Sequence, residues 1–237
     1  MKNSSNPIGI FDSGLGGLTV LREIEKILPQ ENIVYFGDTA HLPYGSKSKS
    51  AIIKFSTQNV LFLLKKKVKM VVIACNTSSS LALDYLKSIF TVPMLGVIDA
   101  GVQKAVMVSE SKKIAVIGTK STIGSGSYQK RINALDRDVK VYAKACPLFV
   151  PLTEEGLIKG KIVSDIVRMY LKDIKGKVDT LILGCTHYPI LKNTIAAYLK
   201  GIYMVDSAKE VALKTKTILE RNSLINETHV VPKKEFY

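Results

Sequence analysis

Two stretches of this chain share one pattern: an apolar run typical of a buried strand, followed by a cysteine and polar residues. Residues 71–77 form an apolar run that ends in Cys-Asn-Thr, and residues 181–187, 110 positions later, form one that ends in Cys-Thr-His. Further upstream, residues 114–119 echo residues 8–13 at an offset of 106. Echoes this far apart indicate that a whole folding unit is duplicated, rather than a short solenoid repeat.

Short β-branched runs alternate with stretches of helical periodicity along the chain. Strands are expected at residues 8–11, 33–36, 70–74, 94–97, 114–119, 139–143 and 181–183. Helices are expected at residues 18–28, 51–64, 79–90, 162–171 and 208–220. This alternation is typical of parallel sheets covered on both faces. The sequence therefore predicts an α/β fold of two similar, pseudo-symmetric domains with mainly parallel sheets, and an active site in the cleft between them.

The echoes also predict where the two units meet. We expect a discontinuous first domain of residues 1–99 plus 208–237, and a second domain of residues 100–207. The helix at 208–220 follows the second unit and is expected to pack back on the first. Residues 222–237 are expected to be a short strand or loop and a frayed tail.

Composition narrows the classes of function. The 237 residues carry a net charge of +14, which indicates either attraction to an anion such as nucleic acid, phosphate or a dicarboxylate, or a lysine-rich solvated surface. Because the lysines are scattered and not interleaved with aromatics, we favour the solvated surface and expect no nucleic-acid partner. The three cysteines lack disulfide or C-x-x-C metal spacing, and we expect free thiols and no metal. No apolar run is long enough for a membrane span, and the polar start lacks a secretory signal, which predicts a cytoplasmic protein without a membrane partner.

Cys75 and Cys185 each lie between a buried strand and a helix start, where free amides and the helix dipole favour a thiolate. Cys146 lacks this context and is interpreted as a small buried hydrophobe. His187 can accept the proton of Cys185, and Asp12 can do so for Cys75 if the first and third strands are neighbours. Two such sulfurs facing one cleft suit removal of a proton from one face of a carbon and its return to the other.

The glycine-rich segment Asp-Ser-Gly-Leu-Gly-Gly at residues 12–17 has three interpretations. The first is a tight strand-to-helix turn capped by Asp12. The second is a small-carboxylate site built from backbone amides. The third is a dinucleotide loop with Asp38 as the ribose ligand, but the third glycine position is Thr19 and Asp12 would repel a pyrophosphate.

Two other loops have an ordinary and a functional interpretation. Residues 37–45 are either a β-to-α loop punctuated by proline and glycine or a polar ligand-binding loop. Glu154 is either a solvated acid at a helix start or the carboxylate that completes an acid–base relay with Cys185 and His187.

Taken together, these segments closely resemble the glutamate racemases of the aspartate/glutamate racemase family, which make D-glutamate for bacterial peptidoglycan without a cofactor. The matching stretches are residues 10–17, 35–45, 74–77, 95–99, 117–119, 147–156 and 184–189. The combination of the glycine-rich loop with Cys-Asn-Thr and Gly-Cys-Thr-His-Tyr-Pro is highly specific.

The resemblance implies a role for each matching residue. Cys75 and Cys185 correspond to the two acid/base thiols, acting on D-glutamate and L-glutamate respectively. The substrate-binding positions are Asp12, Ser13, Tyr44, Gly45, Asn76, Thr77, Thr186 and His187. The supporting ionisable groups are Asp12, Asp38, Glu154 and His187. The resemblance also implies a homodimer and no cofactor.

Two alternatives stay open from the residues alone. The first is a racemase for aspartate or another amino acid on the same fold. The sequence does not show the distance at which the site holds the side-chain carboxylate, so it does not select glutamate. A basic nucleotide- or nucleic-acid-binding module belongs to a different class of function, against which the missing third glycine and the scattered lysines argue.

Overall fold

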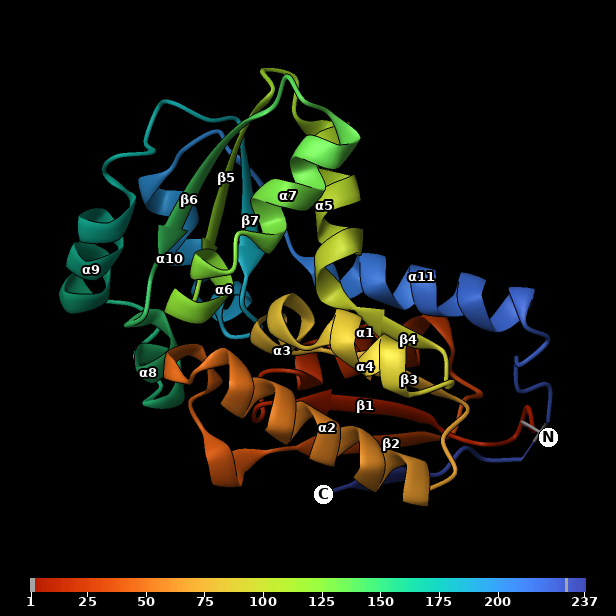
Figure 1. Ribbon diagram of the computed structural model, residues 1–237. Helices are drawn as coiled ribbons and strands as arrows, with labels where there is room; N and C mark the ends of the chain where they lie inside the picture. Colours follow the sequence, from red (N-terminus) through yellow and green to blue (C-terminus); the bar gives the residue numbers. More distant parts are fainter. Residues whose placement is uncertain (1–2, 229) are drawn as a thin grey trace.

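The computed structural model describes residues 3–228 and 230–237, and its strands form two separate sheets with parallel pairing throughout (Figure 1). The first sheet contains β1 (Ile8–Asp12), β2 (Ile33–Gly37), β3 (Met70–Ile73), β4 (Met94–Gly96) and β9 (Lys234–Phe236), in the order β4-β3-β1-β2-β9. The second contains β5 (Lys113–Gly118), β6 (Lys140–Ala145), β7 (Thr180–Gly184) and β8 (Tyr203–Val205), in the order β6-β5-β7-β8.

Apart from β9, the two sheets have the same strand order. In each, the first strand lies between the second and the third, and the fourth lies outside the third. Strands β3 and β7, which precede Cys75 and Cys185, are therefore equivalent, as the duplicated sequence predicts. Asp12 was expected to serve Cys75 only if the first and third strands are neighbours. They are, because β1 pairs with β3 and the amide of Ala74 donates to the carbonyl of Phe11 at 2.9 Å.

Helices and short 3-10 turns connect the strands. The α-helices are α1 (Leu18–Ile27), α2 (Lys49–Lys65), α3 (Asn76–Leu81), α4 (Leu83–Ile89), α5 (Val97–Val108), α6 (Lys120–Gly124), α7 (Ser127–Leu135), α8 (Phe149–Glu154), α9 (Lys161–Leu171), α10 (Lys192–Tyr198) and α11 (Ser207–Arg221). The 3-10 turns are η1 (Thr39–His41), η2 (Tyr44–Ser46) and η3 (Tyr188–Leu191). The single helix expected at 79–90 is in fact two, α3 and α4, which meet at Ala82, and the first begins at Asn76, directly after Cys75.

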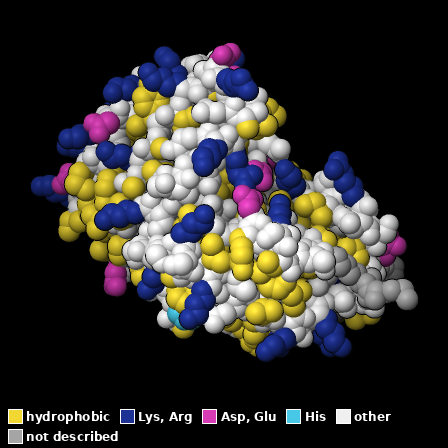
Figure 2. Space-filling view, viewed as in Figure 1, with side chains coloured by type: hydrophobic (Ala, Val, Ile, Leu, Met, Phe, Trp, Pro, Cys, Tyr) yellow, Lys and Arg dark blue, Asp and Glu magenta, His cyan; other side chains and the backbone are white. Residues whose placement is uncertain are grey.

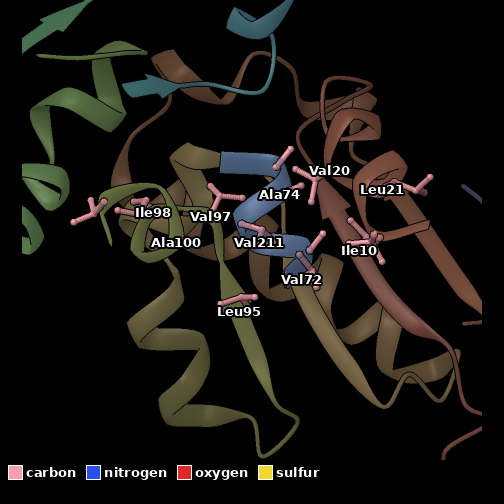
Figure 3. Packing of buried hydrophobic residues seen from close by; sticks show 14 of the residues in the cluster. Ile10, Val20, Leu21, Val72, Ala74, Leu95, Val97, Ile98, Ala100 and Val211 are labelled. Atoms are coloured by element: carbon pink, nitrogen blue, oxygen red, sulfur yellow. The ribbon is translucent and has the colours of Figure 1, made fainter. Parts of the chain in front are cut away.

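Helix α11 packs against α1 and α5, so the last long helix does return to the first half of the chain. Its Val211 is fully buried in a core shared with Ile10, Val20 and Val72 (Figure 3). The division into residues 1–99 with 208–237, and 100–207, stays a prediction; residues 1, 2 and 229, which it includes, lie outside the described part. Helix α5 runs across the expected boundary.

The C-terminal segment ends in a paired strand rather than a frayed tail. Strand β9 extends the first sheet beside β2, and the backbone amide of Tyr237 donates to the carbonyl of Tyr35 at 3.0 Å. Elsewhere on the surface, the lysine and arginine side chains are spread over the face shown in Figure 2 and form no continuous stripe there. No helix within residues 3–228 or 230–237 has the length and apolar character needed to span a bilayer.

Candidate active site

A cavity of about 300 Å³ lies where the carboxyl ends of strands from both sheets meet. Of the residues predicted for the site, it is lined by Ser13, Tyr44, Gly45, Cys75, Asn76, Thr77, Glu154, Cys185, Thr186 and His187. The other lining residues are Leu42, Pro43, Ser46, Thr119, Lys120, Pro147, Val150 and Pro151. A larger open groove of about 870 Å³ has neither cysteine nor histidine among its described lining residues, so the chemistry points to the smaller cavity.

Both predicted thiols reach this cavity, one from each sheet. Cys75 directly precedes α3, two residues after the end of β3, and Cys185 directly follows β7; they are 4% and 7% exposed. Burial raises the pKa of Cys75 to about 11, and the nearby charge of Asp12 acts in the same direction. Burial also raises the pKa of Cys185 above its ordinary value.

The stabilisation of the thiolate expected from the helix start is therefore smaller than the effect of burial in this structure. The backbone amide of Ser78 does lower the pKa of Cys75, and that of His187 lowers the pKa of Cys185. These are smaller effects than the loss of hydration of a buried thiolate, which has the opposite sign. Both sulfurs are consequently thiols near neutral pH, and each needs a base before it can accept a proton from carbon.

Cys185 has such a base beside it. The Nδ1 atom of His187 lies 3.8 Å from the Cys185 sulfur, and its Nε2 atom lies 3.2 Å from a carboxylate oxygen of Glu154. Glu154 is the last residue of α8, so the structure brings it beside His187, which lies 33 positions later in the sequence. These distances suit the acid–base relay expected from the residues, in which the carboxylate would orient the imidazole.

Asp12 lies behind the cavity rather than in its wall. Its Oδ2 atom accepts the backbone amides of Gly17 at 2.9 Å and Gly14 at 3.3 Å, which is the capped tight turn of the first interpretation. Its Oδ1 atom is buried and has no hydrogen-bond partner in the described part of the chain. Burial raises the pKa of Asp12, and the charge of His187 opposes that rise.

Asp38 does not itself line the cavity, and its expected role as a supporting ionisable group stays a prediction. Its buried carboxylate accepts the hydroxyl of Tyr44, and the Nδ1 atom of His41 lies 2.7 Å away. The Nδ2 atom of Asn59 donates to the same Tyr44 hydroxyl at 3.1 Å. The carboxylate thus fixes the loop that carries Tyr44 and Gly45, and those two residues do reach the cavity.

The wall of the cavity also includes residues that the sequence analysis did not assign to the site. The hydroxyl of Thr77 lies 3.1 Å from those of both Thr119 and Thr122, joining the end of one sheet to the end of the other. Thr119 follows β5 as Ser13 follows β1, so the internal repeat contained the signal needed to find it. Val150 and Pro151 form an apolar part of the wall; they lie in the matching stretch 147–156, but the sequence analysis gave them no role.

Cys146 is separate from this site. Its thiol is fully buried, lies 3.8 Å from the carbonyl oxygen of Lys144 and has a pKa raised to about 12 by burial. Within the described residues, no group of three or more His, Cys, Asp and Glu side chains is placed to hold a metal ion.

Comparison with known proteins places the chain among racemases. The family model described as Asp/Glu/Hydantoin racemase matches residues 8–215. The chain belongs to this family. Among relatives of the Asp/Glu/Hydantoin racemase family, a glutamate racemase from Aquifex aeolicus is 51% identical over 213 residues, which cover 90% of this chain and 83% of the relative.

Solved structures of racemases share the fold. The crystal structure of a glutamate racemase from Francisella tularensis in complex with D-glutamate has a TM-score of 0.94 and 39% identity, covering 99% of this chain and 88% of that one. An aspartate racemase from Picrophilus torridus has a TM-score of 0.64 and 16% identity, covering 92% of this chain and 94% of that one. The second likeness concerns the fold alone.

Proposed function

We propose that the protein is a glutamate racemase that interconverts L- and D-glutamate by a two-base proton transfer without a cofactor. The observation that carries the proposal is the pair of thiols, Cys75 and Cys185, which reach one cavity from equivalent strand ends of two sheets. A carbon held between two such groups can lose a proton from one face and gain one on the other. The intermediate does not have to turn over.

Each thiol has a different supporting group. His187, oriented by Glu154, takes the proton of Cys185 when that sulfur must act as the base. Asp12 lies on the strand next to the one that leads to Cys75, and one of its buried carboxylate oxygens has no hydrogen-bond partner within residues 3–228 and 230–237, so it serves the same purpose there. In each direction one sulfur acts as thiolate and the other as thiol, and they exchange roles for the reverse reaction.

The negative charge that develops at the α-carbon spreads into the substrate carboxylate. Preorganised donors aimed at that carboxylate stabilise the charge most effectively in a cavity that is largely closed to water. Ser13, Asn76, Thr77 and Thr186 supply hydroxyl and amide donors in the cavity wall. Lys120 adds a cationic side chain that attracts the anionic amino acid.

Glutamate is favoured over aspartate as the substrate. Relatives between 45% and 51% identical, from several bacteria, are glutamate racemases, whereas the aspartate racemase likeness rests on 16% identity. In this proposal Cys75 acts on D-glutamate and Cys185 on L-glutamate. The product D-glutamate supplies peptidoglycan synthesis in the cytoplasm, and the enzyme works as a homodimer.

Incubation with each enantiomer of glutamate in heavy water, without added cofactor, tests the proposal. The expected result is loss of optical rotation together with deuterium at the α-carbon, and a much slower reaction with either enantiomer of aspartate. Cys75→Ala and Cys185→Ala should each abolish racemisation. Cys146→Ala is the matched control and should retain it, because Cys146 lies outside the cavity wall. Racemisation by both cavity variants would refute the two-thiol mechanism.

A further inference from the structure

The side-chain amide of Asn76 is held by a residue from the opposite half of the chain. The hydroxyl of Tyr128, in α7, donates to the Oδ1 atom of Asn76 at 2.6 Å. Asn76 directly follows Cys75 and is 5% exposed in the cavity wall, whereas Tyr128 is completely buried. Neither the family resemblance nor the lining of the cavity includes Tyr128.

This hydrogen bond fixes which end of the amide faces the cavity. A phenol has one O–H to donate, and a carboxamide has an oxygen that accepts and a nitrogen that carries two donors. Burial raises the pKa of Tyr128 well above its ordinary value, so the phenol keeps its proton. With Oδ1 occupied, Nδ2 is left, and it has no hydrogen-bond partner among residues 3–228 and 230–237.

The ring of Tyr128 also lies beside the end of β7, the strand that leads to Cys185. A Cβ atom placed on Gly184, the residue before Cys185, would lie 3.1 Å from the ring carbon Cε2 of Tyr128. The same side chain therefore lies beside the backbone that leads to one thiol and holds the amide that follows the other. It sets the position of a donor next to Cys75 relative to Cys185.

Helix α7 does not depend on this hydroxyl to stay docked. One turn after Tyr128, the guanidinium of Arg131 donates to the carboxylate of Asp99 at 2.6 Å, and Ile132 is completely buried. Loss of the hydroxyl alone therefore leaves the helix in place and frees only the amide of Asn76.

We propose that Tyr128 is a positioning residue of the racemase: it holds the Asn76 amide so that both N–H donors face the carboxylate of the bound amino acid. The inference rests on the proposed function for its substrate. A freed amide can present its oxygen to that carboxylate instead, which is repulsive. Positioning of this kind acts on catalysis without contact with the substrate.

Tyr128→Phe tests the proposal, because it removes the hydroxyl and keeps the ring. The expected result is a fall of roughly 5- to 10-fold in kcat/KM for glutamate, the scale of one lost hydrogen bond. In an Asn76→Ala background the same substitution should have no further effect. Equal falls in both backgrounds, or no fall in either, would overturn the proposal.

Tyr188→Phe is the matched control for the double-mutant comparison. Its hydroxyl is equally buried and donates to the carbonyl of Cys146 at 2.8 Å, not to Asn76. Any effect of Tyr188→Phe should therefore multiply with that of Asn76→Ala. Coupling as strong as that of Tyr128 would mean that any buried tyrosine hydroxyl produces it, and the proposal would be wrong.

Nuclear magnetic resonance supplies a measurement that needs neither glutamate turnover nor a folded Tyr128 variant. In the wild-type protein the Tyr128 hydroxyl proton should give a slowly exchanging downfield signal, with a nuclear Overhauser contact to the Asn76 side chain. Asn76→Ala should remove that signal. If the protein fails to racemise glutamate but shows this signal, the substrate is wrong and the hydrogen bond stands. Absence of the signal from an active wild-type enzyme would overturn the positioning role alone.

Discussion

Gly16 lies so close to Thr186 that no side chain fits between them. A Cβ atom on Gly16 would lie 2.5 Å from the hydroxyl oxygen of Thr186 and 2.9 Å from Nδ1 of His187. Gly16 belongs to the glycine-rich loop after β1, and the other two residues follow β7. The glycine is therefore needed where the two halves of the chain touch, next to the base that serves Cys185.

Gly16→Ala should lower kcat/KM at least 100-fold while the protein remains folded. The added methyl group must displace His187 or separate the two loops, and a shift of about 1 Å at reacting groups can cost that much. Gly124→Ala is the matched control, because a Cβ there meets no heavy atom of the described residues within 4 Å. Steady-state kinetics and circular dichroism on both variants check the prediction, which a wild-type rate for Gly16→Ala would contradict.

Glu154→Gln should slow racemisation about 10- to 100-fold, at or below the lower end of the range for a direct general acid–base contribution, because Glu154 acts through His187. The amide keeps the shape but no longer carries the charge that stabilises His187 as it takes up a proton. Because the two enantiomers are equally stable in water, kcat/KM must fall equally in both directions. Glu155→Gln, one residue further on and exposed, is the control and should leave kcat/KM unchanged. A fall of the same size in the control would mean that a disturbance of α8, and not loss of the ion pair between Glu154 and His187, lowers kcat/KM.

Asp38→Ala should act on stability and on substrate binding rather than on the chemical step. Without the carboxylate, the buried Tyr44 hydroxyl loses its acceptor, which costs roughly 1–3 kcal/mol of unfolding free energy. The loop that carries Gly45 is then held less firmly, and KM should rise more than kcat falls. Asp138→Ala, at an exposed site, should change neither quantity. A large fall in kcat with unchanged KM would contradict this prediction and indicate that Asp38 acts in the chemical step.

The sequence predicted strands β1 to β7 and the position of both thiols, because a buried parallel strand is a continuous β-branched run and the residues after it lie at the sheet edge. It missed β8 (Tyr203–Val205), which is only three residues long. It could not show that Asp38 lies outside the cavity wall, because that depends on how the loop brings the Tyr44 hydroxyl to the Asp38 carboxylate. The partner of Asn76 was out of reach for a related reason. Tyr128 lies 52 positions away on an amphipathic helix, where a buried tyrosine is indistinguishable from ordinary core.

The pKa values of the thiols were predicted in the wrong direction for a physical reason. The helix start at Asn76 and its amides are legible in the sequence and favour a thiolate. The depth of burial, which sets the larger opposing contribution, depends on how two halves of the chain close over the cavity. The contribution of the helix-start amides to the thiol pKa can be inferred from local sequence, whereas the contribution of burial can be seen only in the tertiary structure.

The raised pKa of Cys75 predicts the pH dependence of the reaction. A thiol is neutral when protonated, so its reactive thiolate becomes more abundant as pH rises toward a pKa of about 11. In an Asp12→Asn variant, which has no carboxylate to take up the thiol proton, the logarithm of kcat/KM for D-glutamate should therefore increase between pH 6 and pH 9. In the wild type and in Cys146→Ala the increase should be smaller, because Asp12 takes up that proton within the enzyme and Cys146 takes no part. An Asp12→Asn profile that is flat between pH 7 and pH 9 would show that Cys75 is already a thiolate in the free enzyme.

The buried pair Lys69 and Glu31 should govern stability without affecting catalysis. Both side chains are almost fully buried, the ammonium donates to Glu31 and to the carbonyl of Ser4, and Glu31 also accepts the backbone amide of Asn226 at 2.9 Å. Lys69 precedes β3, so the pair lies at the opposite end of the sheet from the cysteines. It joins the chain near its beginning to the segment that leads into β9.

Lys69→Ala should therefore lower the free energy of unfolding by about 3–5 kcal/mol, because it leaves Glu31 buried without its partner. Lys69→Met combined with Glu31→Gln should lose less, since neither variant side chain carries a charge. Lys26→Ala, which breaks the exposed pair with Glu23, should cost less than about 1 kcal/mol. Urea unfolding measures all three, and kcat of the folded fraction should not change. If the single and double variants at the buried site were equally destabilised, packing rather than the unpaired charge would be the cause.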